Sequence, residues 1–520
     1  MNPKNNEQHM VAVPPGLDLN ALPSHQPVLL SEAKIACGLF YFEKKGKRKW
    51  ELKGLYRTAF IQLLLKLGYA KLYKDPKGYH YVHRENNLIE EVEINRMLDR
   101  VREIVFAYYA KGLCFPFEGQ EITATRELLR ETFFKQSNLI FNATFLENLE
   151  SFSLPLLRDT KDRAFLPFKN GFVTVTAGQV TFSGYWELKD HYLWKLHVLA
   201  KEYRPVQDFT QGHFYRFIKN ISNWENERFW AFVSAIGYLL HNYHTPATSQ
   251  AIVCIDEAVT DQNTPQGGTG QGLFLQALQH VRNTLCKDGK KFNENDRFAF
   301  QGIHYLTQIF ALDDVKKHFD FDRLHSLSNN GWAVEQKYEP EKWIPPEYCP
   351  KMVITSNHIP SLEGTTRKRR LFPLEFSDYY SKMIKSGIEQ PVVKEHGCTF
   401  FSHEWNDTEW GLFYNFIIYC IQYYLRNGLQ SYEHKNIALN TFKQKVDPSF
   451  FEWAMQQAFQ AEIKYKTQEW YKCFVHLCGF TNKDYSQRAF SNNVKHFAAY
   501  KGWKTVFKGP DFYFIPNLQA

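Results

Sequence analysis

The chain has 520 residues, enough for roughly three or four domains, and 44% of them are hydrophobic. With 63 Lys and Arg against 55 Asp and Glu, its formal net charge is +8, which suits an acidic polymer as a partner. No apolar run approaches about twenty residues and the N-terminus lacks a charged-then-apolar layout, which argues against a membrane span and a signal peptide. The nine cysteines contain no CxxC pair and fit reduced thiols in a cytoplasmic compartment.

Taken in chain order, residues 1–30 are rich in Pro, Asn and Gln, and we expect a flexible tail there. Residues 31–205 read as an α+β region without a primase-type acidic motif. Period-two alternation and turn residues predict its strands, at 39–42, 50–53, 70–73, 79–83 and 164–182. Helical spacing predicts its helices, at 56–67, 89–109 and 120–150.

The pattern changes near Pro205. Two helical segments, 214–221 and 227–241, precede strands that alternate with helices from 250 to 376, which predicts a parallel sheet. An apolar helix at 408–428 and a polar stretch that links domains follow. We therefore expect an α/β protein with the following division after the N-terminal region: 206–385 as the core domain, 386–448 as a helical lid and linker, and 449–520 as a small module.

A glycine-rich run is the most informative feature of the core. Gln266-Gly267-Gly268-Thr269-Gly270-Gln271-Gly272 lies between the strand-like Ala251–Ile255 and the helix-like Leu273–Leu278. Strand, glycine-rich turn and helix start form the setting in which backbone N–H groups cradle phosphates. The usual pattern ends in Gly-Lys-Ser/Thr. Here Gln271 stands in place of the lysine, and Gly272 in place of the hydroxyl that holds Mg²⁺.

Polar residues then follow two further strands in a meaningful order. The buried-strand pattern 306–314 ends in Asp313 and Asp314, and an ATPase needs an acid there to hold Mg²⁺ and polarise water. The strand 351–357 ends in Asn357, an amide suited to orienting a water beside a γ-phosphate. Taken alone, an acidic strand end is also an ordinary turn.

Two basic elements complete the constellation. A predicted hairpin, 331–343, carries Lys337 and Lys342 and is flanked by Trp332 and Trp343, which either stack on a ligand or pack. Arg367-Lys368-Arg369-Arg370 precedes the strand-like 371–376. In isolation the first reads as a solvated hairpin and the second as a solvated basic turn.

In this order the elements resemble the superfamily 3 helicases of viruses, phages and plasmids, and more narrowly the helicase domain of phage and mobile-element primase-helicases. The resemblance covers about 206–380 and implies an AAA+-like P-loop core that forms a hexameric ring on single-stranded DNA, with ATP and Mg²⁺ as cofactors. It implies roles for these residues: phosphate binding by Gly267, Gly268, Thr269 and Gly270, with Gln271 and Gly272 completing the loop; Mg²⁺ binding by Asp313; water activation by Asp314; a sensor at Asn357; a finger toward the neighbouring subunit at Arg369 or Arg370; and a DNA grip at Lys337 and Lys342.

Gln271 departs from this pattern, because an amide supplies no charge to the β- and γ-phosphates. One account is a family helicase whose lysine was replaced, and the intact acids and arginines favour it. The other is a naturally inactive ring. Rescue of the charge would fall to Lys287, Lys290 or Lys291.

The C-terminal module has three helical segments, 451–461, 468–478 and 486–500, followed by two short strands within 503–515. Three helices and a hairpin suggest a winged helix. Apolar residues share one face of the third helix, which leaves Arg488 and Lys495 for solvent or duplex DNA.

The sequence thus predicts an ATP-dependent DNA helicase or translocase that serves replication of a phage or mobile element in the cytoplasm of a bacterial host, alongside a separate primase or polymerase. The alternative from another class is a non-enzymatic DNA-binding ring that loads or marks a replication origin.

Overall fold

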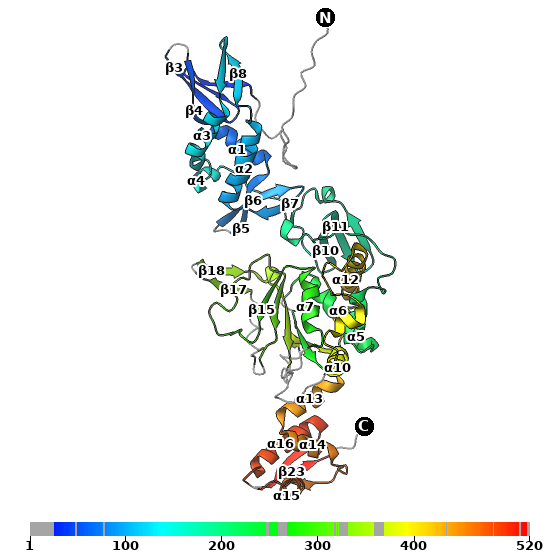
Figure 1. The fold of residues 1–520 in the computed structure, drawn as a ribbon. Coiled ribbons are helices and arrows are strands. Elements are labelled where there is room, and N and C mark those ends of the chain that lie inside the picture. The colour runs from blue at the N-terminus through cyan, green and yellow to red at the C-terminus, as the bar shows by residue number, and fades with distance from the viewer. Residues whose placement is uncertain are drawn as a thin grey trace. The chain divides into compact units, whose positions relative to one another are not determined.

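The computed structural model describes residues 25–516 except 47–48, 76–77, 246–248, 258–267, 317–318, 320, 322–330, 338, 358–368, 433, 482 and 509–510. The chain divides into two compact units (Figure 1). One comprises the residues up to 157 together with 183–198, and the other comprises 158–182 and all residues from 199 onward.

The first unit is α+β, as its alternating strand and helix patterns predict. A four-stranded antiparallel sheet in the order β1-β2-β3-β4 and a second sheet in the order β13-β7-β6-β5 accompany the hairpin β8-β9. Apolar residues of α1, α2 and α3 fill a core against the first sheet and the hairpin. The elements are β1 (Pro27–Ser31), β2 (Lys34–Cys37), β3 (Phe40–Lys45), β4 (Lys49–Leu55), α1 (Arg57–Lys66), β5 (Tyr69–Asp75), β6 (Gly78–Glu85), β7 (Leu88–Glu91), α2 (Ile94–Tyr108), β8 (Leu113–Phe117), β9 (Gln120–Ala124), α3 (Arg126–Gln136), α4 (Ala143–Leu146) and β13 (Leu193–Trp194).

A five-stranded parallel sheet forms the centre of the second unit, which confirms the expected α/β core. Its order is β15-β16-β19-β14-β20, and every neighbouring pair is parallel. Successive residues of β14 enter different cores: Ile252 packs toward the helices, and Val253 packs toward the opposite face. Because both faces are covered, the inner strands β14 and β16 read as nearly continuous apolar runs. The strands are β14 (Ala251–Asp256), β15 (Thr284–Asp288), β16 (Ile309–Asp313), β19 (Lys351–Ser356) and β20 (Leu371–Phe376).

Helices α5 (His213–Ile221), α6 (Asn226–Leu240), α7 (Gln271–Gln279) and α12 (Asp407–Asn427) share one core with a face of this sheet (Figure 1). The antiparallel pair β10 (Arg163–Phe168) and β11 (Gly171–Thr176) joins that core, and β12 (Val180–Ser183) continues its sheet. Helices α6 and α12 approach closely at Gly237, where a Cβ would lie 2.6 Å from the Cβ of Tyr424.

The other face of the sheet is covered by a hairpin, β17 (Trp332–Gln336) and β18 (Glu339–Ile344), together with Phe292, Phe300 and Phe319. Helices α10 (Tyr379–Lys385) and α11 (Pro391–His396) follow β20. None of the helices in the described part of the chain is long and apolar enough to span a membrane.

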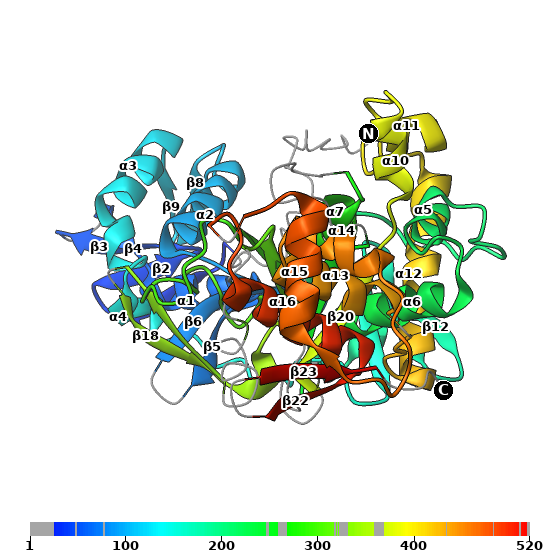
Figure 2. The same ribbon diagram turned by 90° about the horizontal axis from the view of Figure 1, so that it is seen from below.

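The C-terminal module, drawn in orange and red in Figure 2, has a core of its own. The stretch 429–448, expected as a linker, contains helix α13, whose Phe442 is 2% exposed and stacks on Tyr500 with ring centroids 5.0 Å apart. Three helices and the sheet β21-β23-β22 follow; the sequence predicts the three helices and the hairpin of β22 and β23, but not β21. The elements are α13 (Lys435–Lys445), α14 (Pro448–Gln456), β21 (Tyr465–Lys466), α15 (Thr467–Cys478), α16 (Gln487–Lys501), β22 (Lys504–Lys508) and β23 (Asp511–Ile515).

Candidate nucleotide site

The carboxyl edge of the parallel sheet is the candidate nucleotide site. Strand β14 lies between β19 and β20, so the chain travels to one side of β14 for β15, β16 and β19 and then crosses to the other side for β20. Such a reversal opens a crevice at the carboxyl ends of the strands, where ligands of open α/β sheets bind. Helix α7 begins at this edge with Gln271, and the N–H groups of its first turn have no intrahelical partners.

Two glycines before α7 adopt conformations that other residues avoid. The φ angle is +94° at Gly268 and +104° at Gly270, the N-cap of α7. A Cβ on Gly270 would also lie 2.8 Å from the ring of Phe217. Glycine at these positions therefore lets the backbone turn tightly into the helix and leaves room beside it. Gly267 lies outside the described residues.

Gln271 and Thr269 both face the end of β14. The Gln271 amide donates a hydrogen bond to Oδ1 of Asp256 at 2.6 Å, and the Thr269 hydroxyl donates to the same oxygen at 2.6 Å. The position usually held by lysine thus binds a strand-end carboxylate through a neutral group. At Gly272, nothing lies within 4 Å of the place that a Cβ would occupy, so a serine or threonine there would fit.

Asp256 is a site residue that the sequence reasoning missed, although an acid that directly follows the apolar run Ala251–Ile255 was a usable signal. It is 7% exposed. Burial raises its pKa to about 6, the two hydrogen bonds from Thr269 and Gln271 oppose the rise, and the charge of Asp314 adds to it. The site therefore holds a carboxylate that lacks the neutralising lysine of the usual pattern.

The acidic pair and the expected sensor meet at the neighbouring strand ends. The Thr355 hydroxyl donates to Oδ1 of Asp313 at 2.7 Å and accepts from the backbone N–H of Asp314 at 2.7 Å. Asp314 has φ +58°, and the Asn357 amide donates to its Oδ1 at 3.1 Å. The structure thus brings Asp313, Asp314 and Asn357 together, with Thr355, unforeseen from the sequence, joining the two acids.

Among the three lysines considered for a rescue, Lys290 is the one that reaches this edge. It forms an ion pair with Asp314, and that partner raises the pKa of Lys290. Gly289 permits the approach, because its N–H donates to the carbonyl of Asp313 at 2.6 Å and a Cβ there would lie 2.8 Å from the same oxygen. Lys287 instead donates to the carbonyl of Ala299 at 2.6 Å, and Lys291 pairs with Asp288 at 3.5 Å.

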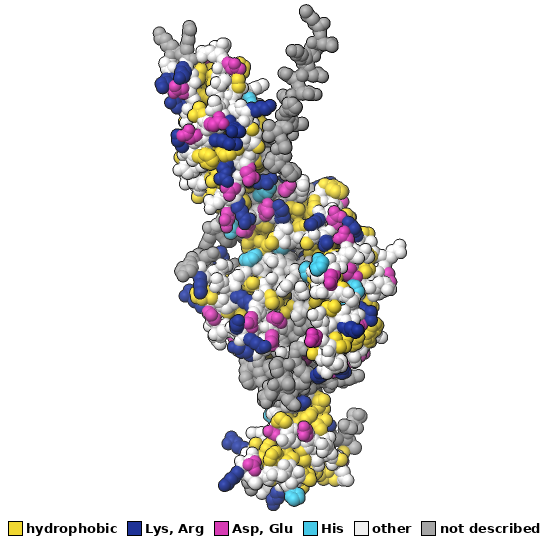
Figure 3. All heavy atoms as spheres, in the orientation of Figure 1, with side chains coloured by type: hydrophobic (Ala, Val, Ile, Leu, Met, Phe, Trp, Pro, Cys, Tyr) yellow, Lys and Arg dark blue, Asp and Glu magenta, His cyan; other side chains and the backbone are white. Residues whose placement is uncertain are grey.

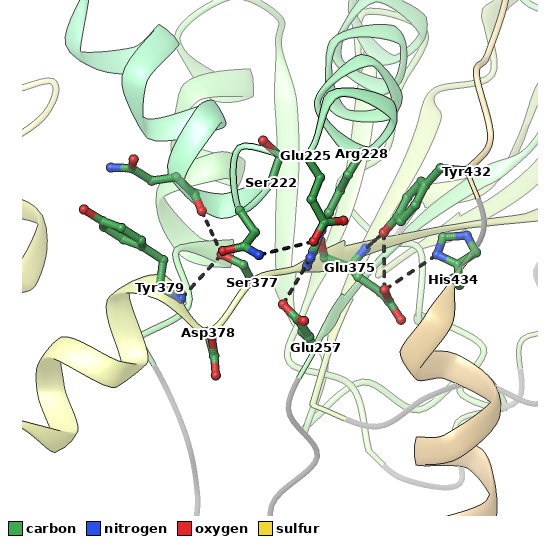
Figure 4. Close-up of polar contacts among 12 residues, drawn as sticks. Ser222, Glu225, Arg228, Glu257, Glu375, Ser377, Asp378, Tyr379, Tyr432 and His434 are labelled. Carbon is green, nitrogen blue, oxygen red and sulfur yellow. Dashed lines mark hydrogen bonds and ion pairs between the residues drawn. The ribbon is translucent and has the colours of Figure 1, made fainter.

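A buried arginine fixes the start of the connection that follows β14 (Figure 4). Arg228, on α6, is 2% exposed, and its guanidinium contacts Oε2 of Glu257 at 3.1 Å and the carbonyl of Glu375 at 2.9 Å. Figure 4 shows that Tyr432 and His434, which follow α12, approach the Glu375 carboxylate from the other side. The chain leaving β14 is thereby tied to β20 and to the segment after α12.

The arginine cluster lies at the opposite edge of the sheet. Arg369 and Arg370 directly precede β20, and Gln250, just before β14, donates to the Arg369 carbonyl at 3.1 Å. Because β20 runs parallel to β14 with Phe376 beside Asp256, the start of β20 lies about 17 Å from the acidic edge. Within one chain these arginines are not beside the acids. Residues 367 and 368 lie outside the described part.

The hairpin separates its two tryptophans. Trp332 is 1% exposed and packs on Phe300 with ring centroids 5.1 Å apart, whereas Trp343 is 57% exposed. Lys337, in the turn, and Lys342, in β18, are exposed. The hairpin therefore presents two lysines and one tryptophan to solvent.

In the C-terminal module, Arg488 and Lys495 lie on the exposed side of α16. The ammonium of Lys495 is 5.5 Å from the ring centroid of Phe507 in β22, and that phenylalanine is 62% exposed. Figure 3 shows Lys and Arg side chains at the edge of this module. The helix and the hairpin thus share one basic, partly apolar surface.

Among the described residues, no group of three or more His, Cys, Asp or Glu side chains is arranged to hold a metal ion. A single strand-end acid, Asp313, fits Mg²⁺ that is held chiefly by phosphate and water oxygens, the manner in which Mg²⁺ usually binds at nucleotide sites. The donor set therefore suits a nucleotide-borne Mg²⁺ and does not suit an all-protein metal cage.

No protein-family model and no curated protein matches this chain. Among solved structures, the A form apo structure of the NrS-1 C-terminal region is similar over 88% of this chain and 99% of that chain, at 12% identity and a TM-score of 0.37. A structure of JCV helicase with a bound N-phenylacetamide compound is similar over 46% of this chain and 63% of that chain, at 12% identity and a TM-score of 0.26. At these scores the likeness carries no conclusion, so the function has to be argued from the geometry of the site.

Proposed function

We propose that this chain is an ATP-dependent DNA helicase or translocase whose nucleotide site is impaired by Gln271. One observation carries the proposal: the carboxyl ends of β14, β16 and β19 gather a glycine-shaped helix start, an acidic pair and an amide at one edge of a parallel sheet. That combination suits phosphoryl transfer, in which the protein positions the phosphates and water and stabilises charge.

Each group has a defined task in this proposal. The backbone around Gly268 and Gly270 receives the phosphates at the start of α7. Asp313 would hold Mg²⁺, which would supply positive charge to the phosphates when bound. Asp314, oriented by Asn357, accepts a proton from the attacking water. Lys290 offsets the negative charge of Asp314 through their ion pair. It does not replace the lysine that is missing from the loop at Gln271.

DNA is the proposed polymer along which the protein moves. The lysines of the β17–β18 hairpin hold single-stranded DNA, and α16 with its hairpin contacts duplex DNA through Arg488 and Lys495. A hexameric ring with Arg369 or Arg370 reaching a neighbour's nucleotide completes the proposal, with a phage or mobile element in a bacterial cytoplasm as its setting.

A non-enzymatic DNA-binding ring is the second candidate, and the hydrogen bond from Gln271 to Asp256 favours it. Because that amide already satisfies the buried carboxylate, the loop is stable without a lysine and without turnover. In such a ring a bound nucleotide would stabilise the conformation of the loop and would not be hydrolysed.

Nucleotide binding to the full chain tests the location of the site. Equilibrium titration with Mg-ATP should show that Gly270→Ala weakens binding by about tenfold or more, because the new Cβ meets Phe217 and the φ angle costs roughly 1–3 kcal/mol. Gly479→Ala, in the C-terminal module, is the control, since its φ of +69° also favours glycine and nothing lies near its Cβ, and it should stay within about twofold. Equal affinities for both variants would place the nucleotide elsewhere, and no binding by the native chain or by Gln271→Lys would sink the proposal.

A further inference from the structure

We propose that Asp256 is a nucleotide-binding residue in its protonated form, and that it takes up one proton from solvent when phosphates occupy the loop beside it. The proton removes a negative charge from the site, which offsets in part the positive charge that Gln271 does not supply. The inference deepens the proposed function and rests on it, because it requires a nucleotide at the start of α7.

Asp256 lies between the sheet and the phosphate loop. It is the last residue of β14 and is 7% exposed. Thr269, in the turn before α7, and Gln271, the first residue of α7, both donate hydrogen bonds to its Oδ1 at 2.6 Å. Its second oxygen, Oδ2, accepts no hydrogen bond from the described residues. A buried carboxylate with one oxygen left over has a place for a proton.

The two hydrogen bonds do not neutralise the charge of Asp256. A hydroxyl and an amide lower the cost of burying a carboxylate, but neither carries a net charge. The neighbouring strands contribute Ser356 of β19 and Phe376 of β20 beside this end of β14, and both are uncharged. Cys254, two residues earlier, is fully buried, and burial raises the pKa of its thiol, so it is neutral as well.

The charged groups around this strand end leave the balance negative. Asp314, which follows β16, adds a like charge to the surroundings of Asp256, and Lys290 pairs with Asp314. Glu257, the next residue along the chain, pairs with Arg228 (Figure 4). The two nearby cations are therefore already engaged by other carboxylates, and no cation in the described part of the chain forms an ion pair with Asp256.

A bound phosphate should complete the protonation. Burial raises the pKa of Asp256 to about 6, and the charge of Asp314 adds to the rise. Phosphates at the start of α7 would bring further negative charge close to the carboxylate, which raises the pKa again. A group whose pKa rises on binding takes up a proton, so the ligand binds more tightly as the pH falls. On Oδ2 the proton also turns an acceptor into an O–H donor that suits a phosphate oxygen.

Calorimetric titration of the full chain measures this proton directly. A non-hydrolysable ATP analogue with Mg²⁺ would be titrated at pH 7 and pH 8, in buffers of different ionisation enthalpy. The native chain should take up about one proton more per nucleotide at pH 7 than Asp256→Asn, whose amide is permanently uncharged. Because ionisation of the nucleotide itself is common to both chains, the difference belongs to Asp256. From pH 8 to pH 7, the native affinity should rise up to about tenfold relative to that of Asp256→Asn.

Two further variants complete the test. Gln271→Lys places a fixed positive charge opposite Asp256, so it should take up no more protons than Asp256→Asn, and it decides the question by itself if Asp256→Asn does not fold. Asp190→Asn, which removes an exposed acid of the other unit, is the control and should match the native chain.

The outcomes separate the inference from the proposed function. If the native chain, Asp256→Asn and Gln271→Lys all bind the nucleotide with equal proton uptake, the inference is overturned and the nucleotide site stands. If none of these three chains binds the nucleotide at either pH, the proposed function fails and the inference fails with it.

Discussion

At the scale of single residues, the proposed function depends most on the pair formed by Gln271 and Asp256. A lysine at this position would place a charge opposite a buried carboxylate and beside bound phosphates. The glutamine keeps the hydrogen bond to Asp256 and discards the charge. On the proposed function, glutamine in place of lysine would be mild for the fold and severe for phosphoryl transfer, since the loop would lack electrostatic stabilisation and keep its shape.

Asp256 should make the native chain less stable as the pH rises from about 4 to about 6. Its pKa in the folded chain, about 6, exceeds the unfolded value, so the folded state binds more protons in this window and the free energy of unfolding falls with increasing pH. Asp256→Asn keeps an acceptor for Thr269 and Gln271 and removes the titration. It should raise stability at pH 7 by roughly 2–3 kcal/mol and flatten this part of the pH profile.

Denaturant unfolding at pH 4.5 and pH 7 checks this, with Asp288→Asn, an exposed acid, as the control. If Asp256→Asn is instead less stable than the native chain at pH 7, ionisation of Asp256 does not lower the free energy of unfolding.

At the scale of secondary-structure elements, the strand ends locate the site. The apolar runs that end at Asp256, Asp313 and Ser356 all became parallel strands of one sheet. Parallel strands share one carboxyl edge, so the polar residues that end these runs converge there. This part of the arrangement follows from the order of the motifs along the chain.

Thr355→Val should separate the role of the hydroxyl from that of the strand. The hydroxyl bridges Asp313 and the N–H of Asp314, and valine preserves the shape while leaving that partly buried N–H without its acceptor, at a cost of about 1–3 kcal/mol. In a Gln271→Lys background, ATP turnover should fall on the order of tenfold. Thr355→Ser keeps the hydroxyl and should retain both stability and turnover. Equal behaviour of the two variants in thermal unfolding and turnover would show that the bridge is dispensable.

The sequence predicted most elements of the core, the hairpin and the module, because their apolar periodicity is strong. It could not show which side chains meet. Lys290 reaches Asp314 only because Gly289 lets β15 and β16 approach, and Arg228 contacts Glu257 across the packing of α6 on the sheet. Likewise, Trp332 and Trp343 look alike in sequence, and only the register of the hairpin buries one and exposes the other.

At the scale of the whole molecule, the two arginines lie too far from the acids to act on a nucleotide bound at the acidic edge of the same chain. Arg369 and Arg370 lie at the amino edge of the sheet, and the acids lie at the carboxyl edge. If these arginines act on a nucleotide, the nucleotide belongs to a neighbouring subunit of a ring.

Complementation tests this assembly. In the Gln271→Lys background, neither an Arg369→Ala/Arg370→Ala chain nor an Asp313→Ala chain should turn over ATP appreciably. Mixing them should restore part of the activity, because some interfaces then join an intact acid site to an intact arginine pair. Inactive mixtures of chains that co-sediment as one assembly would assign the arginines to DNA or to the surface instead.

The most direct measurement of the central claim is steady-state hydrolysis of saturating Mg-ATP by the native chain, by Gln271→Lys and by Gln271→Lys/Asp314→Asn, each with and without single-stranded DNA. The account predicts that the lysine raises turnover by on the order of a hundredfold or more, and that the loss of the Asp314 carboxylate abolishes the gain. Gln271→Lys/Gly272→Ser should be at least as active, since open space surrounds position 272. If Gln271→Lys and the double variant with serine both stay at the native rate while binding Mg-ATP, the carboxyl edge of this sheet is not an ATPase site.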